Sequence, residues 1–264
     1  MNKTFDIKRF GNVLRHDAMS YLQNFGWTLV VLLAIPILIW FILYINMDDT
    51  EAVVNYERYG FLLVLAIIAM ILAPSRLYKN ANDSRKGIQF AMLPASNMEK
   101  FLSMSIYCLV VTPILYLAGA VAIDSILALI PGNNPYGGFV FRNIFHTNIM
   151  KVELNDDIFL MPLPFYQVFL LLSYVSIFMF TNMIFKKRKV SKTIGILALI
   201  GIIFMVIFIK VMLYYENIYE YDMIPDDTQE ILARWAYYGY YVFNIILTVA
   251  MLYLTYYKIR KQKY

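Results

Sequence analysis

Long apolar stretches alternate with short polar segments along the whole chain. The hydrocarbon core of a bilayer is roughly 30 Å thick and an α-helix rises about 1.5 Å per residue, so about 20 apolar residues span it. Most of the stretches reach that length without a charge near their middle. Since a helix satisfies its own backbone in lipid, the pattern predicts an all-α, polytopic membrane bundle. The six predicted transmembrane helices cover residues 27–46, 59–77, 101–129, 164–185, 191–213 and 236–257.

The polar segments between these stretches alternate in charge. Lysine and arginine dominate residues 1–26, 76–100, 186–192 and 258–264, whereas acidic residues dominate 47–58, 131–163 and 214–235. The positive-inside rule then places both termini and the basic loops in the cytoplasm. The sequence therefore predicts an integral protein of the inner, cytoplasmic membrane, with three external loops.

Length and composition agree with a single transmembrane domain over residues 1–264. Apolar residues make up 61% of the chain and charged residues 16%, as in a bundle with small loops. The net charge of +5 lies on the loops predicted to be cytoplasmic, where topology and anionic lipid headgroups explain it. Membrane lipids are thus expected partners, and nucleic acid is not.

The segment before the first predicted span, residues 5–25, has the pattern of an amphipathic helix. Apolar residues recur at spacings of three or four, and basic or polar residues fall on the other side. Such a helix lies in the membrane interface. It either contacts a cytoplasmic partner or serves only as an anchor, and the sequence favours neither. Its predicted apolar face comprises Ile7, Phe10, Leu14, Ala18, Tyr21 and Phe25.

The loop between the second and third spans has the clearest local signals. Asp83 can cap a short helix over residues 84–92, which Leu93-Pro94 would end. Ser96 and Glu99 have the spacing of a capping box, in which each side chain satisfies a free amide at the start of the next helix. Proline interrupts the helix that follows, because Pro113 lacks an amide proton.

Catalytic chemistry is hard to place in this sequence. By the predicted topology His16 and His146 lie on opposite sides of the membrane, so they cannot share a metal. No phosphate-binding glycine loop is present, and the chain is not expected to be an enzyme. Asp124 and Lys210 lie within predicted spans near the outer interface, where they could pair with each other in a structural role, or Lys210 could extend alone to the interface.

Around the second loop the sequence resembles the permease of ABC-2-type transporters. The resemblance lies in Leu93-Pro94-Ala95-Ser96, followed by Glu99-Lys100 and then a membrane helix, together with the six-span layout. Asn97 departs from the pattern, because a basic residue is common there. In that family a coupling helix just ahead of this element docks on an ATPase subunit. The resemblance implies contacts with such a partner by Asp83, Arg85, Lys86, Gly87, Gln89, Phe90, Pro94, Ser96 and Glu99.

The same resemblance implies how the chain would work. ATP and Mg would be bound by a separate ATP-binding cassette subunit, and no cofactor is expected in this chain. A second permease chain, identical or different, would complete the pathway. The transported substrate would be a hydrophobic or amphipathic molecule, moved outward. Two other classes stay open from the residues alone: a non-transporting membrane scaffold and an intramembrane enzyme.

Overall fold

The structure is a computed structural model of the chain. It describes residues 5–46, 55–79, 81–82, 87–131, 134–141, 149–154, 157–162, 166–218 and 226–261. The helices are α1 (Ile7–Asn24), α2 (Gly26–Asn46), α3 (Asn55–Leu77), α4 (Gly87–Met92), α5 (Asn97–Ser105), α6 (Thr112–Ala128), α8 (Tyr166–Ile184), α9 (Lys189–Ile218) and α10 (Asp226–Lys261). A π-helix, η1 (Ile106–Val111), joins α5 to α6, and strands β1 (Ile149–Leu154) and β2 (Asp157–Pro162) pair antiparallel.

Helical residues occupy each predicted span within the described parts of the chain, and the third span consists of α5, η1 and α6. Among the described residues, five helical stretches are long and apolar enough to cross a membrane: Gly26–Ile45, Glu57–Leu77, Asn97–Ala128, Lys189–Lys210 and Tyr238–Lys261. Helix α8 carries a shorter apolar stretch, Phe169–Ile184. The chain is therefore a helical integral membrane protein, as its hydropathy predicted. The hairpin of β1 and β2 is the one departure from an all-α chain among these residues.

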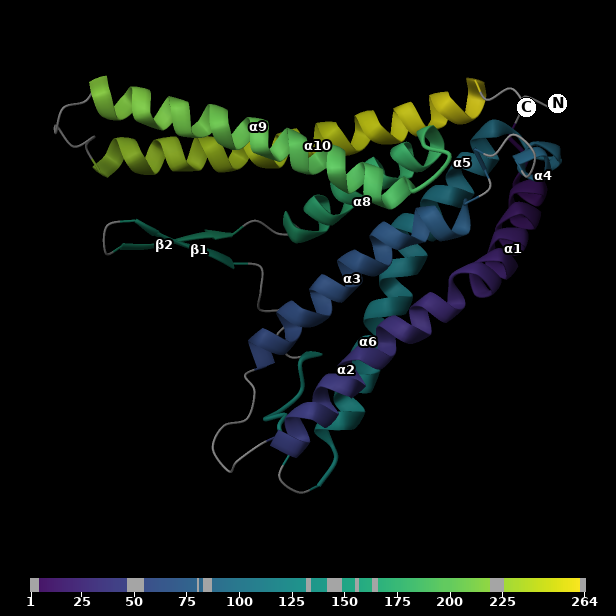
Figure 1. Cartoon of the computed structure of the whole chain (residues 1–264), viewed down its shortest axis with the longest axis horizontal. Helices are drawn as coiled ribbons and strands as arrows, with labels where there is room; N and C mark the ends of the chain where they lie inside the picture. Colours follow the sequence, from purple (N-terminus) through teal and green to yellow (C-terminus); the bar gives the residue numbers. More distant parts are fainter. Residues whose placement is uncertain are drawn as a thin grey trace.

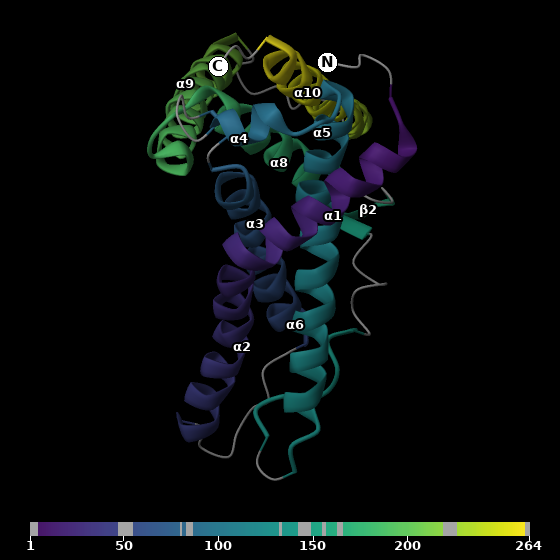
Figure 2. The same ribbon diagram turned by 90° about the vertical axis from the view of Figure 1, so that its right-hand side faces the viewer.

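The membrane helices form two arms that meet at one end and diverge from it (Figure 1). The first arm consists of α2, α3 and α6, and the second of α8, α9 and α10. Helices α1, α4 and α5 lie where the arms meet, and we call this region the junction (Figure 2). The start of α1 and the end of α10 both lie at the junction end of the molecule.

Small residues let the helices of the first arm approach one another closely. Helix α3 buries Ala66, Ala69 and Ala73 in the core of this arm, against aromatic side chains that include Tyr116 of α6. At Gly119 an added Cβ would lie 3.0 Å from the nearest methyl carbon of a leucine on α2. Without a hydrophobic drive between helices in lipid, such close packing is what holds them together.

Methionine dominates the core of the junction, where both arms contribute. Met70 of α3 and Met104 of α5 pack with Met179 and Met183 of α8, and all four are buried. Methionine is unbranched and polarizable, so it fills irregular space and adapts when neighbouring helices shift. The two arms thus meet through side chains that can repack.

The interruption predicted at Pro113 takes the form of a π-helix. Residues Ile106–Val111 form η1, and α6 then starts with Pro113 in its first turn. The backbone carbonyl of Tyr107 accepts bonds from both the N–H and the hydroxyl of Thr112. A π-bulge of this kind displaces the helical hydrogen-bond ladder where proline has no amide to donate.

Candidate functional site at the junction

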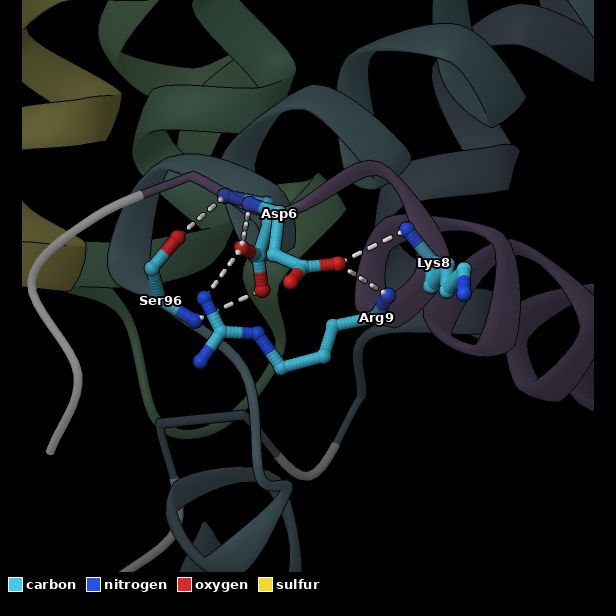
Figure 3. A network of polar contacts seen from close by, with 5 residues as sticks. Asp6, Lys8, Arg9 and Ser96 are labelled. Carbon is cyan, nitrogen blue, oxygen red and sulfur yellow. Dashed lines mark hydrogen bonds and ion pairs between the residues drawn. The ribbon is translucent and has the colours of Figure 1, made fainter.

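A single buried carboxylate joins the starts of two helices at the junction (Figure 3). Glu99 and Ser96 form the predicted capping box at the start of α5, with Glu99 Oε2 accepting the Ser96 N–H at 2.9 Å. Glu99 Oε1 also accepts the N–H of Asp6 at 2.9 Å and Nη2 of Arg9 at 3.2 Å. Asp6 in turn caps α1 by accepting the N–H groups of Lys8 and Arg9. The Glu99 side chain is fully buried, so α1 and α5 are fixed to each other here.

A second buried carboxylate, Asp17 of α1, connects three elements. Its Oδ2 accepts the hydroxyl of Tyr78 at 2.8 Å and that of Ser103 at 2.6 Å, and Oδ1 lies 3.2 Å from Nδ1 of His16. Burial, together with the charge of Asp17, raises the pKa of Tyr78 well above its ordinary value. The phenol therefore stays protonated at neutral pH and acts as a donor to Asp17.

The segment 78–82, which follows α3, is bonded to the second arm as well. The side-chain amide of Asn82 donates to the carbonyl of Ile184, at the end of α8, at 2.8 Å. The ammonium of Lys189, at the start of α9, donates to the carbonyl of Lys79 at 2.9 Å. This segment is therefore bonded to α1 through Tyr78 and to the second arm through Lys79 and Asn82.

Helix α4 is attached to the same segment and to α5. The ammonium of Lys100 donates to the carbonyl of Phe90 at 2.8 Å and lies 5.3 Å from the centre of its ring. Lys100 is almost fully buried, so this contact is shielded from water. The Phe90 ring meets the Tyr78 ring edge-on, with 6.2 Å between their centres. A displacement of α4 would thus reach both Tyr78 and α5.

A cavity of about 340 Å³ opens beside this network. Its walls come from the second half of α1, the end of α3, the segment 78–82, α4 and the turn that follows α4. Asp17 and Tyr78 line it together with several polar side chains of α1.

The residues expected to contact an ATPase fall into three groups. Asp83, Arg85 and Lys86 lie outside the described residues, and Gln89 lies on α4 without a described side chain. Gly87 begins α4 and is buried, Phe90 of α4 is partly buried against Tyr78 and Lys100, and Pro94 is exposed in the turn after α4. Ser96 and Glu99 face inward and cap helices, so they hold α5 in place.

The predicted pairing of Asp124 with Lys210 is wrong. Asp124 Oδ2 lies 3.6 Å from Nη2 of Arg58, and both side chains are buried at the tip of the first arm. The Arg58 guanidinium also lies 3.9 Å above the ring of Tyr136, and it donates to the carbonyl of Gly138. Lys210 lies on α9 with an exposed side chain. Arg58 and Asp124 both belong to the first arm, whereas Lys210 belongs to the second arm, and the arms diverge away from the junction (Figure 1).

Sequence reasoning passed over Asp17 and Arg58, although each carried a signal. Asp17 falls between Leu14 and Tyr21 on the apolar stripe of α1. A carboxylate on such a stripe is buried when the helix packs, so it needs hydrogen-bond partners. Arg58 is the lone basic residue of an acidic segment and stands directly before a span. On the predicted apolar face of α1, Tyr21 and Phe25 are buried in the protein, whereas Ile7 is 77% exposed.

Among the residues that the structure describes, no group of three or more His, Cys, Asp or Glu side chains is placed to hold a metal. Comparison with protein-family models, with curated proteins and with solved structures finds no match for this chain. The junction is thus interpreted from its own geometry.

Proposed function

We propose that this chain is the permease subunit of an ABC-2-type transporter, driven by a separate ATPase that docks at the junction. The observation that carries the proposal is the position of the segment 78–82. It stands directly before the loop that resembles a coupling element, and it is bonded both to Asp17 of α1, which Ser103 of α5 also contacts, and to the second arm. A force applied to α4 would therefore act on both arms at once.

The contacts at the junction would transmit this force from α4 to α1 and α5. Phe90 of α4 touches Tyr78, and Tyr78 is bonded to Asp17 of α1. Lys100 fixes α4 to α5, the first segment of the longest apolar helix. The methionine core between the arms can repack while these polar bonds keep the moving parts connected. Rocking of one arm against the other is the motion that such a joint favours.

The proposed permease spans the membrane six times, with α8 as the sixth membrane helix. Its 19 residues would extend about 28 Å at 1.5 Å per residue, close to the thickness of the hydrocarbon core. An even number of spans requires both termini on one side, and the start of α1 and the end of α10 do lie at one end. Basic residues of the connecting segments at that end favour the cytoplasm.

The working assembly would contain two permease chains and two ATPase subunits that bind ATP and Mg. Exposed isoleucine, phenylalanine and valine side chains cover α9 through much of its apolar length, as expected of a helix that faces lipid or a second permease. The substrate would be a hydrophobic or amphipathic molecule exported from the cytoplasmic side. The cytoplasmic (inner) membrane is the expected location.

Purification of the tagged chain from its native membrane, in mild detergent, tests the proposal. An ATP-binding cassette protein should co-purify with it in stoichiometric amount. Phe90→Ala should reduce the recovered ATPase severalfold, because it removes the ring that joins α4 to Tyr78. Phe139→Ala is the matched control, since Phe139 is an exposed phenylalanine of the segment at the tip of the first arm. Recovery of the chain without any ATPase would overturn the proposal.

A further inference from the structure

The cavity at the junction has a chemical character of its own. Its volume of about 340 Å³ exceeds what one or two waters fill, and it has room for the end of a long side chain. Among its described lining residues there is one carboxylate, Asp17, and neither lysine nor arginine. The buried Lys100, which contacts Phe90, is not part of the lining. Among these described lining residues, His16 is therefore the one group beside Asp17 that could carry a positive charge.

Asp17 is placed to bind a cation in this cavity. The residue is only 8% exposed, and the hydroxyls of Tyr78 and Ser103 hold Oδ2 in a fixed position. Oδ1 lies beside His16, and a carboxylate oxygen has two acceptor sites, so Oδ1 can accept a further donor. Tyr78, Ser103 and His16 contact the carboxylate, and the described lining residues give it no arginine or lysine partner. A bound cation would supply one.

The remaining lining suits a guanidinium or ammonium group. Ser20, Gln23 and Asn24 of α1 offer hydroxyl and amide oxygens along one wall, and the aromatic residues Tyr78 and Phe90 form part of another. A guanidinium presents five donors in a planar fork, which a carboxylate and nearby amide oxygens can satisfy together. A neutral ligand of the same shape would leave the Asp17 charge uncompensated.

We propose that this cavity binds one guanidinium or ammonium group, presented by a basic side chain of the cytoplasmic ATPase partner. The identity of the donor rests on the proposed function, whereas the preference for a cation rests on Asp17 and the lining. The position fits this role, because the cavity is bordered by α4 and the turn after it, where the partner would dock. A partner side chain bound to Asp17 would reach Tyr78 and α1 without passing through α4.

Butylguanidinium is a suitable probe, and butylurea is its neutral counterpart of nearly the same shape. Binding of each to the purified full chain in detergent is measured by saturation-transfer NMR and by titration. Butylguanidinium should bind and butylurea should bind at least tenfold more weakly. Asp17→Asn should weaken butylguanidinium by roughly tenfold, the loss of one charge-assisted contact. The control Glu57→Gln removes an exposed carboxylate on α3 and should change nothing.

A second variant covers the case in which Asp17→Asn fails to fold. Ser20→Leu fills part of the cavity without altering Asp17 or its bonded partners, and it should also weaken butylguanidinium. Equal binding of the two probes, or unchanged binding in these variants, overturns the cation site.

The ATPase co-purification tests separately whether the partner supplies the cation. If the probe binds but Asp17→Asn recovers as much ATPase as the unmodified chain, the partner is not the source of the cation and that half of the proposal fails. If no ATPase co-purifies at all, the proposed function fails while the cation site stands.

Discussion

The carboxylate of Glu99 accepts a hydrogen bond from the backbone N–H of Asp6, which lies 93 residues earlier in the chain, at 2.9 Å. The same side chain caps its own helix through Ser96. Two helix N-termini, each with unsatisfied amides and a positive dipole end, thus share one negative charge. This arrangement holds α1 against α5, so the helix before the first span is part of the junction and not a separate anchor.

Substituting Glu99→Ala should destabilise the chain by about 2–4 kcal/mol, because a capping box and a buried charge-assisted contact are lost together. The thermal unfolding midpoint in detergent measures this, and protease cleavage within α1 should become faster. The control Glu57→Ala removes an exposed carboxylate from the first turn of α3 and should cost well under 1 kcal/mol. Equal midpoints for the two variants would show that α1 does not depend on Glu99.

The basic pair Arg85 and Lys86 precedes α4 and is expected at the surface of the ATPase. Replacing both with glutamate should reduce ATPase recovery at least severalfold, through repulsion of the acidic surface that a basic pair would face, while membrane insertion is retained. The same change at Lys186 and Lys187, which are exposed in another basic segment, is the matched control. Unchanged recovery and unchanged ATPase stimulation would remove this loop from the interface.

The length and composition of apolar runs were enough to predict where the membrane helices lie. Hydropathy acts on about 20 consecutive residues, so it needs no knowledge of neighbours. The Ser96–Glu99 capping box was equally predictable, because its two residues are three positions apart and act on each other's backbone. Local chemistry of this kind is readable from spacing alone.

Partners far apart in sequence could not be chosen in this way. Asp17 meets Tyr78 and Ser103 across separations of 61 and 86 residues, and only the packing of α1 on α5 brings them together. Lys210 was considered as a partner of Asp124 from its depth in the membrane, whereas the tertiary fold places Arg58 beside Asp124. The hairpin did carry a local signal, since Asn155 and Asp156 are turn-forming residues between two β-prone segments. Hydropathy, which detects membrane helices, does not detect this hairpin.

The proposed topology predicts which positions are accessible from outside the cell. In a Cys108→Ser background, cysteines at positions 50 and 228, in place of Thr50 and Thr228, should react with an impermeant thiol reagent in intact cells. A cysteine replacing Ser191, near the start of α9, should react only after the cells are opened. Labelling of the Ser191→Cys variant in intact cells would reverse the orientation and contradict the cytoplasmic placement of the junction.

The ion pair of Arg58 and Asp124 is buried, so each charge depends on the other. Asp124→Leu or Arg58→Met alone should destabilise the chain by about 3–5 kcal/mol, because the remaining charge is left in a buried site without its ion-pair partner. The double variant Arg58→Met with Asp124→Leu should recover most of that loss, since it removes both charges and keeps the volume filled. Unfolding midpoints of the four proteins give the coupling between the two positions.

A matched cycle of Asp124→Asn with Lys210→Met should show no coupling, because Lys210 is exposed on α9. Additive effects at Arg58 and Asp124, or coupling of Asp124 to Lys210, would contradict the pairing described above.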